Sequence, residues 1–312
     1  MVYLCSLKQL ILPLIMKKTI LKFINPISLL KARSYQKKNS KYEKSSYDLE
    51  LYLYSKILKN DMLHYGYFED VNIEPETISI KQLEDAQVKY AENIIEKIKN
   101  TKDPVLDVGC GMGGLSALML RKGLTVEALT PNKNQIAHIK NKYPELISHQ
   151  CKFEDFVSNK KFGTIINSES LQYISLDKAF MNVENLLLPN GRWIIVDFFR
   201  IHSDGISRSS HLLEDFIEKT KDFGWNIVYE KDITANALPT MKFVDMYAKR
   251  FLQPVIHYAF EKLRYKKAWI YYLTQDLKDS INKKVNKELA SIDPEKFASE
   301  KKYLLFVLER NV

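Results

Sequence analysis

Cysteine, glycine and proline are scarce in this sequence, and long apolar runs are missing. Three cysteines, at positions 5, 110 and 151, are too few for a disulfide framework, and their spacing fits no zinc motif. Ten glycines and ten prolines among 312 residues exclude collagen-like and low-complexity chains. The strongest apolar stretch near the start, residues 10–16, is far shorter than the roughly 20 residues of a transmembrane helix. We therefore expect a globular, cytoplasmic protein.

Acidic residues are rare in the first 60 residues, where 12 Lys/Arg and 3 Asp/Glu account for the whole net charge of +9. The remaining sequence is balanced, so a nucleic-acid partner is not expected. Four interpretations of residues 1–45 as a basic amphipathic arm stay open: peripheral contact of residues 1–40 with an anionic membrane surface, a helix packed on the body, a solvated tail, or a targeting segment at its start. Residues 46–312 are expected to form one domain.

Short apolar runs alternate with helical stretches after Pro104, which is typical of βαβ units. Helical spacing between residues 47 and 99 predicts an N-terminal helical cap. The long stretch before the last strand predicts a helical lid over residues 231–300, with flexible ends such as residues 236–240. The expected fold is α/β: a Rossmann-like, seven-stranded, mostly parallel sheet with helices on both faces and the lid inserted between strands six and seven. The strands are predicted at residues 105–108, 125–129, 146–151, 163–167, 192–199, 225–229 and 303–308.

A glycine-rich turn, Asp107-Val108-Gly109-Cys110-Gly111-Met112-Gly113-Gly114, follows the first predicted strand. Glycines let a backbone approach a ligand closely, and the following helix offers free N–H groups. We expect a side chain at Gly109 to fill the space that the ligand needs. The carboxylate of Asp107 suits a ligand with an ammonium group, or it only caps the turn.

The same spacing fits the dinucleotide fingerprint GxGxxG, so a nicotinamide-dependent oxidoreductase stays a rival interpretation. That fingerprint expects an acidic residue at the end of the second strand. Here the strand ends in Leu129-Thr130-Pro131, and Glu127 lies too early. The second strand therefore counts against the dinucleotide interpretation.

The turn resembles motif I of class I S-adenosylmethionine-dependent methyltransferases. Thr130-Pro131-Asn132-Lys133-Asn134-Gln135 is similar to the end of strand two in the tocopherol, sterol and cyclopropane fatty acid synthase group. His64-Tyr65-Gly66-Tyr67-Phe68 and Ser168-Glu169-Ser170-Leu171 are similar to that group's aromatic loop and its motif after strand four. The resemblance implies methyl transfer from S-adenosylmethionine to a small, amphipathic or lipid-like acceptor, by C-, O- or N-methylation. A non-catalytic lipid- or membrane-binding protein on the same fold stays an alternative.

The resemblance also implies a set of site residues. Glu169 and His64 are the catalytic candidates, although Glu169 equally fits a solvated helix cap and a lone loop histidine is commonly structural. Lys152 stands where such enzymes commonly have an aspartate for the adenine, so Glu154 or Asp155 is expected to substitute. No metal ligand is expected. The cofactor-binding candidates are Tyr65, Tyr67, Asp107, Gly109, Cys110, Gly111, Gly113, Thr130, Pro131, Asn132, Gln135, Glu154, Asp155 and Ser168.

Overall fold

The computed structural model describes residues 21, 24–39, 59–203, 210–266 and 293–310, together with short stretches between 271 and 289. The chain divides into two compact units, Met1–Asp48 and Leu49–Val312. In the first unit, helix α2 (Pro26–Asn39) carries exposed Ile27, Leu29 and Leu30. The rest of the predicted arm, and the part of the cap predicted before residue 59, lie outside the described residues. None of the described helices is long and apolar enough to cross a bilayer.

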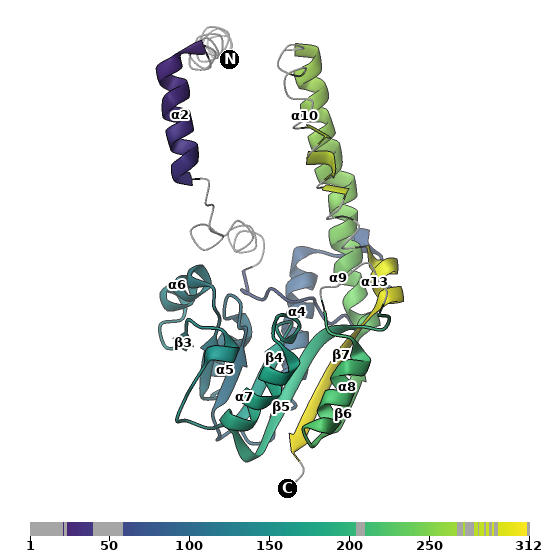
Figure 1. Cartoon of the computed structure of the whole chain (residues 1–312). Coiled ribbons are helices and arrows are strands. Elements are labelled where there is room, and N and C mark those ends of the chain that lie inside the picture. The colour runs from purple at the N-terminus through teal and green to yellow at the C-terminus, as the bar shows by residue number, and fades with distance from the viewer. Residues whose placement is uncertain are drawn as a thin grey trace. The chain divides into compact units, whose positions relative to one another are not determined.

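The second unit is built on a seven-stranded sheet with the order β3-β2-β1-β4-β5-β7-β6 (Figure 1). Neighbouring strands from β3 to β5 are parallel, whereas β7 runs antiparallel to both β5 and β6. The predicted seven-stranded, mostly parallel sheet is confirmed. The strands are β1 (Val105–Val108), β2 (Val126–Leu129), β3 (Ile147–His149), β4 (Phe162–Ser168), β5 (Leu187–Arg200), β6 (Trp225–Asp232) and β7 (Lys301–Arg310).

Helices cover both faces of the sheet because side chains alternate along each strand. Val105 and Ile194 pack in one apolar layer with α4 (Ile80–Ile95), α5 (Gly114–Arg121) and α6 (Lys133–Lys142). Leu106 and Ile195, one residue further along, pack in a second layer with α7 (Leu176–Leu186) and α8 (Leu213–Asp222). Three short 3-10 helices connect these elements: η1 (Pro75–Thr77), η2 (Phe153–Asp155) and η3 (Leu171–Tyr173).

Helix α4 fixes the loop that precedes it. Ser79 and Gln82 form a capping box at the start of the helix. One turn further on, the buried amide of Gln87 donates from Nε2 to the carbonyl oxygens of Met62 (2.9 Å) and His64 (2.8 Å). Its Oε1 accepts from Asn60 Nδ2 (3.0 Å), so the whole buried amide is satisfied by the segment before α4 and holds the start of the aromatic loop, residues 64–68, against the helix.

A helical insertion separates β6 from β7, as predicted. It begins with α9 (Thr234–Tyr247), continues through a π-helical turn (Ala248–Leu252) into α10 (Gln253–Lys266), and ends with α13 (Pro294–Glu300) (Figure 1). The expectation of flexible ends at residues 236–240 is wrong, because these residues lie in α9 and are tied to the aromatic loop. Asn236 Nδ2 donates to Phe68 O (2.7 Å), and Thr240 Oγ1 accepts from Gly66 N–H (3.0 Å).

Candidate active site

Asp107 lies in β1 at the start of the glycine turn. Its buried carboxylate accepts a hydrogen bond at Oδ2 from Ser116 Oγ in the first turn of α5 (2.5 Å). Burial raises the pKa of Asp107 to about 6, and the hydrogen bond from Ser116 opposes that rise. A carboxylate in this position is stabilised by a cationic group placed beside it, so it suits the ammonium group of a ligand.

Gly109 is required by packing within the protein. Its φ of +76° is in the left-handed region, where a side chain is unfavourable. A Cβ built on Gly109 would lie 2.3 Å from the Cβ of Ser170, in the loop after β4. A side chain here would therefore first displace the loop that carries Ser170, so a substitution is expected to disturb the fold as well as the proposed ligand site.

The remaining turn offers backbone donors to a ligand. The N–H groups of Gly109 and Cys110 already donate to Leu129 O, at 2.8 and 3.1 Å. Those of Gly111 and Met112 have no acceptor among the described residues. They adjoin the N-terminus of α5, whose first N–H groups also lack helical partners, so this part of the turn favours an anionic or polar ligand group.

The end of β2 carries a neutral polar pair. Thr130 is buried, and its Oγ1 donates to Gln135 Oε1 (2.6 Å). Asn132 caps α6 by accepting from the N–H groups of Asn134 (2.9 Å) and Gln135 (3.4 Å), while Pro131 is exposed. This edge therefore presents hydroxyl and amide groups to a ligand, without a carboxylate.

Of the acidic residues near β2 and β3, one is held in ion pairs within the protein, and two lie at the surface. Glu127 binds His149 Nε2 and Lys160 Nζ, both at 2.7 Å, so its carboxylate is committed within the protein. Glu154 is half-buried and Asp155 is exposed in η2, after β3. Of the two predicted adenine-binding carboxylates, Glu154 is thus the one that the fold partly encloses.

Glu169 follows β4 and has a φ of +51°, which is unusual for a residue other than glycine. Its Oε1 accepts hydrogen bonds from Tyr65 N–H (3.0 Å) and Tyr303 O–H (2.6 Å), whereas its Oε2 has no partner among the described residues. Burial raises the pKa of Glu169 to about 7, against the lowering effect of both hydrogen bonds. This carboxyl therefore changes protonation near neutral pH, as a general base must.

A chain of hydroxyl groups extends from Glu169 into the core. Tyr303 O–H lies 2.9 Å from Tyr90 O–H, which lies 2.9 Å from Ser168 Oγ. When Tyr303 donates to the ionised Glu169, it accepts from Tyr90, and Tyr90 in turn accepts from Ser168. Sequence reasoning found Ser168 but missed both tyrosines, since neither belongs to a local motif.

Aromatic rings form a wall beside Glu169. Tyr65 meets Phe297 and Tyr303 edge to face, with ring centroids 6.5 and 6.1 Å apart. Phe198 completes the set at 5.9 Å from Phe297 and 6.2 Å from Tyr303. The four rings come from the aromatic loop, β5, α13 and β7, so segments far apart in the sequence build one aromatic cluster, in which Phe297 and Tyr303 are buried and Tyr65 and Phe198 are half-buried.

His64 is buried and stacks on Tyr90 with the ring centroids 4.0 Å apart. Its Nδ1 lies 2.9 Å from the carbonyl oxygen of Tyr65, so Nδ1 carries the proton and donates. Nε2 is buried without a partner. Burial lowers the pKa of His64 to about 4, so the ring is neutral and Nε2 is a hydrogen-bond acceptor.

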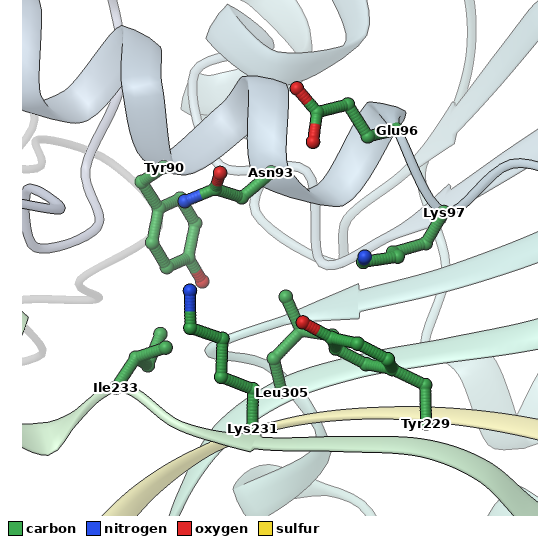
Figure 2. Close-up of a pocket in the computed structure, with 8 residues that line it drawn as sticks. All are labelled: Tyr90, Asn93, Glu96, Lys97, Tyr229, Lys231, Ile233 and Leu305. Carbon is green, nitrogen blue, oxygen red and sulfur yellow. The ribbon is translucent and has the colours of Figure 1, made fainter.

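Tyr67 lies with a different group of residues. Its hydroxyl accepts a hydrogen bond from Lys231 Nζ (2.8 Å), which lies 4.8 Å from the centroid of the tyrosine ring. Lys231 and Lys97 point into a small pocket between α4 and β6, where Lys97 lies over the ring of Tyr229 (Figure 2). The ring of Tyr67 therefore already faces a cation supplied by the protein.

The structure thus brings together Tyr65, Ser168 and Glu169, with His64 linked to them through Tyr90. The contact between Gly109 and Ser170 joins this group to the glycine turn. Of the other predicted residues, Tyr67 contacts Lys231, and Pro131 and Asp155 are exposed. The described part of the chain holds no group of three or more His, Cys, Asp or Glu arranged to bind a metal.

A family model described as mycolic acid cyclopropane synthetase matches residues 34–223. The match spans more than half of the chain, so the protein belongs to this family of S-adenosylmethionine-dependent methyltransferases. Family membership confirms the predicted enzyme class and S-adenosylmethionine as the cofactor. A comparison with curated proteins found no match.

Solved structures of low sequence identity share the fold. A cyclopropane synthase from Mycobacterium tuberculosis is 14% identical with a TM-score of 0.58, over 83% of this chain and 95% of that one. A geranyl diphosphate C-methyltransferase from Streptomyces coelicolor A3(2), solved with Mg²⁺, geranyl diphosphate and S-adenosyl-L-homocysteine, is 18% identical with a TM-score of 0.56, over 80% and 89%. The cyclase SpnF is 18% identical with a TM-score of 0.59, over 83% and 93%. These likenesses confirm the fold class.

Proposed function

We propose that the protein methylates a small, lipid-like acceptor and that Glu169 removes a proton from that acceptor. The observation that carries the proposal is the geometry of Glu169, whose Oε1 is held by Tyr65 and Tyr303 while its Oε2 is left without a partner. Bound S-adenosylmethionine supplies an activated methyl group. The acceptor would gain that methyl group on carbon, oxygen or nitrogen as the bond from sulfur to methyl breaks and S-adenosylhomocysteine leaves, and it would lose a proton to Oε2, so charge and atoms balance.

The residues at the strand ends fit the cofactor by their chemistry. Asp107 offers a buried carboxylate to the ammonium group, and the free N–H groups of Gly111 and Met112 face polar atoms near it. Thr130 and Gln135 offer neutral hydrogen bonds to the ribose, each worth about 0.5–1.5 kcal/mol. Glu154 is proposed for the adenine amino group, and the buried Nε2 of His64 is proposed as an acceptor for a cofactor N–H or O–H.

The acceptor is proposed to lie against the aromatic wall of Tyr65, Phe198, Phe297 and Tyr303. Tyr65 and Phe198 are the half-buried members of this wall, and their ring faces offer apolar contact that suits an acyl or isoprenoid chain. The relatives agree with this chemistry, since one is a cyclopropane synthase and another binds geranyl diphosphate. The wall also excludes water from the reacting atoms, which protects the transferred methyl group.

Calorimetric titration with S-adenosylhomocysteine separates cofactor binding from chemistry. Asp107→Ala is expected to weaken binding by at least about tenfold, because a charge-assisted hydrogen bond is lost. Glu169→Gln is expected to bind normally but to lose transfer of labelled methyl into extracted lipids, while Glu218→Gln on the exposed face of α8 retains it. Full turnover by Glu169→Gln would contradict the base assignment. Cofactor binding without label transfer to any lipid would favour the non-catalytic alternative, and binding of NADH instead would favour an oxidoreductase.

We further propose residues 46–312 as the catalytic domain and residues 1–45 as a basic arm that brings the protein to a membrane surface. The arm holds the whole net charge, and α2 exposes Ile27, Leu29 and Leu30. Deleting residues 1–40 should weaken sedimentation with anionic liposomes, and salt should do the same, because exposed charges are screened within about 10 Å at 0.1 M. Equal binding with and without the arm would remove this assignment.

A further inference from the structure

The helical insertion carries an exposed apolar stripe that the methyltransferase site does not use. The exposed fractions are 58% for Phe251, 61% for Val255, 62% for Tyr258 and 79% for Tyr265. These side chains follow one another along the π-helical turn and α10, beyond the part of the insertion that packs on the sheet (Figure 1). Clustered apolar exposure of this kind marks a contact surface.

The stripe places apolar side chains on the solvent-facing side of the helix, where polar side chains are usual. At 100° per residue, Val255, Tyr258 and Tyr265 fall within an arc of about 80° on α10. Ile256 and Phe260, on the other side, are half-buried and line a pocket with the described residues Lys278 and Val285. One apolar face is thus covered by the chain itself, whereas the second remains open to solvent.

Positive charge accompanies the open face. Between residues 242 and 266 there are six Lys/Arg and only two Asp/Glu. Asp245 pairs with Lys249 and Glu261 with Arg264, so both acidic residues are neutralised. Lys262, which lies 5.3 Å from the ring centroid of Tyr258, and Lys266 pair with no carboxylate among the described residues. The open face therefore presents apolar side chains bordered by free cations.

We propose that the stripe of Phe251, Val255, Tyr258 and Tyr265 docks on an anionic lipid bilayer. The apolar side chains enter the boundary between headgroups and acyl chains, the tyrosine hydroxyls remain at headgroup level, and Lys262 and Lys266 contact anionic headgroups. A second copy of the chain fits less well, since pairing two identical stripes would bring the same cations together. The proposal goes beyond methyl transfer and is independent of the N-terminal arm.

Full-length protein carrying Phe251→Ser, Val255→Ser and Tyr258→Ser tests the apolar part. Ile147→Ser, Val157→Ser and Met181→Ser form a matched control, because these side chains are also exposed but lie on other elements. Sedimentation with vesicles of phosphatidylcholine and phosphatidylglycerol is expected to weaken by at least about tenfold in the stripe variant and to be unchanged in the control. Equal binding by wild type and the stripe variant, with both folded by circular dichroism, would overturn the proposal.

Lys262→Gln with Lys266→Gln tests the charged part and is expected to reduce the preference for these vesicles over vesicles of phosphatidylcholine alone. Hydrogen exchange locates the contact: peptides within residues 244–266 should be protected by the anionic vesicles, and peptides of α7 should not. Protection confined to residues 1–40 would assign membrane binding to the arm and refute the stripe. Concentration-dependent self-association that the stripe variant abolishes, without vesicle binding, would instead identify an interface between copies of the chain.

Discussion

Replacing Glu169 by glutamine should stabilise the protein at alkaline pH while removing its activity. The pKa of Glu169 is raised by burial from 4.5 to about 7. Each pKa unit corresponds to about 1.4 kcal/mol, so the ionised carboxylate costs up to about 3 kcal/mol of folding free energy. The pKa of Glu169 is higher in the folded than in the unfolded protein. The free energy of unfolding is therefore greatest below about pH 4.5, where Glu169 is protonated in both states, and it falls as the pH rises through about 7. Glutamine does not ionise, so it avoids this loss.

Urea unfolding at about pH 5 and about pH 8.5 measures the effect without any acceptor. Wild type and Glu169→Gln should have similar free energies of unfolding at the lower pH, and the variant should gain about 2–3 kcal/mol at the higher one. Glu127→Gln is the control of opposite sign. Burial raises the pKa of Glu127, but the hydrogen bonds from Lys160 and His149 have the larger effect, and the net pKa lies below its usual value. The ionised carboxylate of Glu127 therefore stabilises the fold at neutral pH. A gain for Glu169→Gln that is the same at both pH values would refute the reasoning.

Three further outcomes follow from the site. Gly109→Ala should lower the free energy of unfolding by about 3 kcal/mol in thermal melts, whereas Gly123→Ala, with a similar φ but open space around its Cβ, should lower it by about 1–2 kcal/mol. Equal losses would show that the loop carrying Ser170 moves away at little cost. Tyr303→Phe should move the midpoint of the pH–activity profile upward by about one unit, because a hydrogen bond to the ionised Glu169 is lost; an unmoved midpoint would leave Tyr303 a packing residue. Hydrogen exchange in residues 231–300 should slow when S-adenosylhomocysteine and acceptor are both bound, and unchanged exchange would make the insertion a static layer.

Local patterns were enough to predict the sheet, because alternating apolar runs and helical stretches are encoded by neighbouring residues. The largest error in strand length is in β5, which begins at Leu187 although the prediction began at residue 192. Pro189-Asn190-Gly191 is typical of a turn. In the structure the pairing of β5 with β4 shifts register at this point, so β5 continues through a bulge. From the sequence alone, the same three residues look like the boundary of the strand.

The site was predicted where it depends on strand ends and missed where it depends on distant contacts. Asp107 lies near the end of the first strand and Glu169 directly follows the fourth, so their placement toward the carboxyl edge of the sheet could be inferred. Tyr303 and Tyr90 are separated by 213 positions in the chain, and only the finished sheet brings their hydroxyl groups together. The close approach of Gly66 to Ala86 in α4 and Thr240 in α9 likewise required the packing of both helices to be known.

The place of β7 between β5 and β6 has a consequence for protein synthesis. A growing chain completes the glycine turn and Glu169 long before β7 has been translated. Until then β6 lacks β7, its one partner strand among the described residues, and Glu169 lacks the hydroxyl of Tyr303. Contacts this distant in sequence form late in folding. An unfinished chain can therefore form the turn proposed to bind the cofactor before the proposed base is positioned, so on this proposal activity requires β7 to be in place.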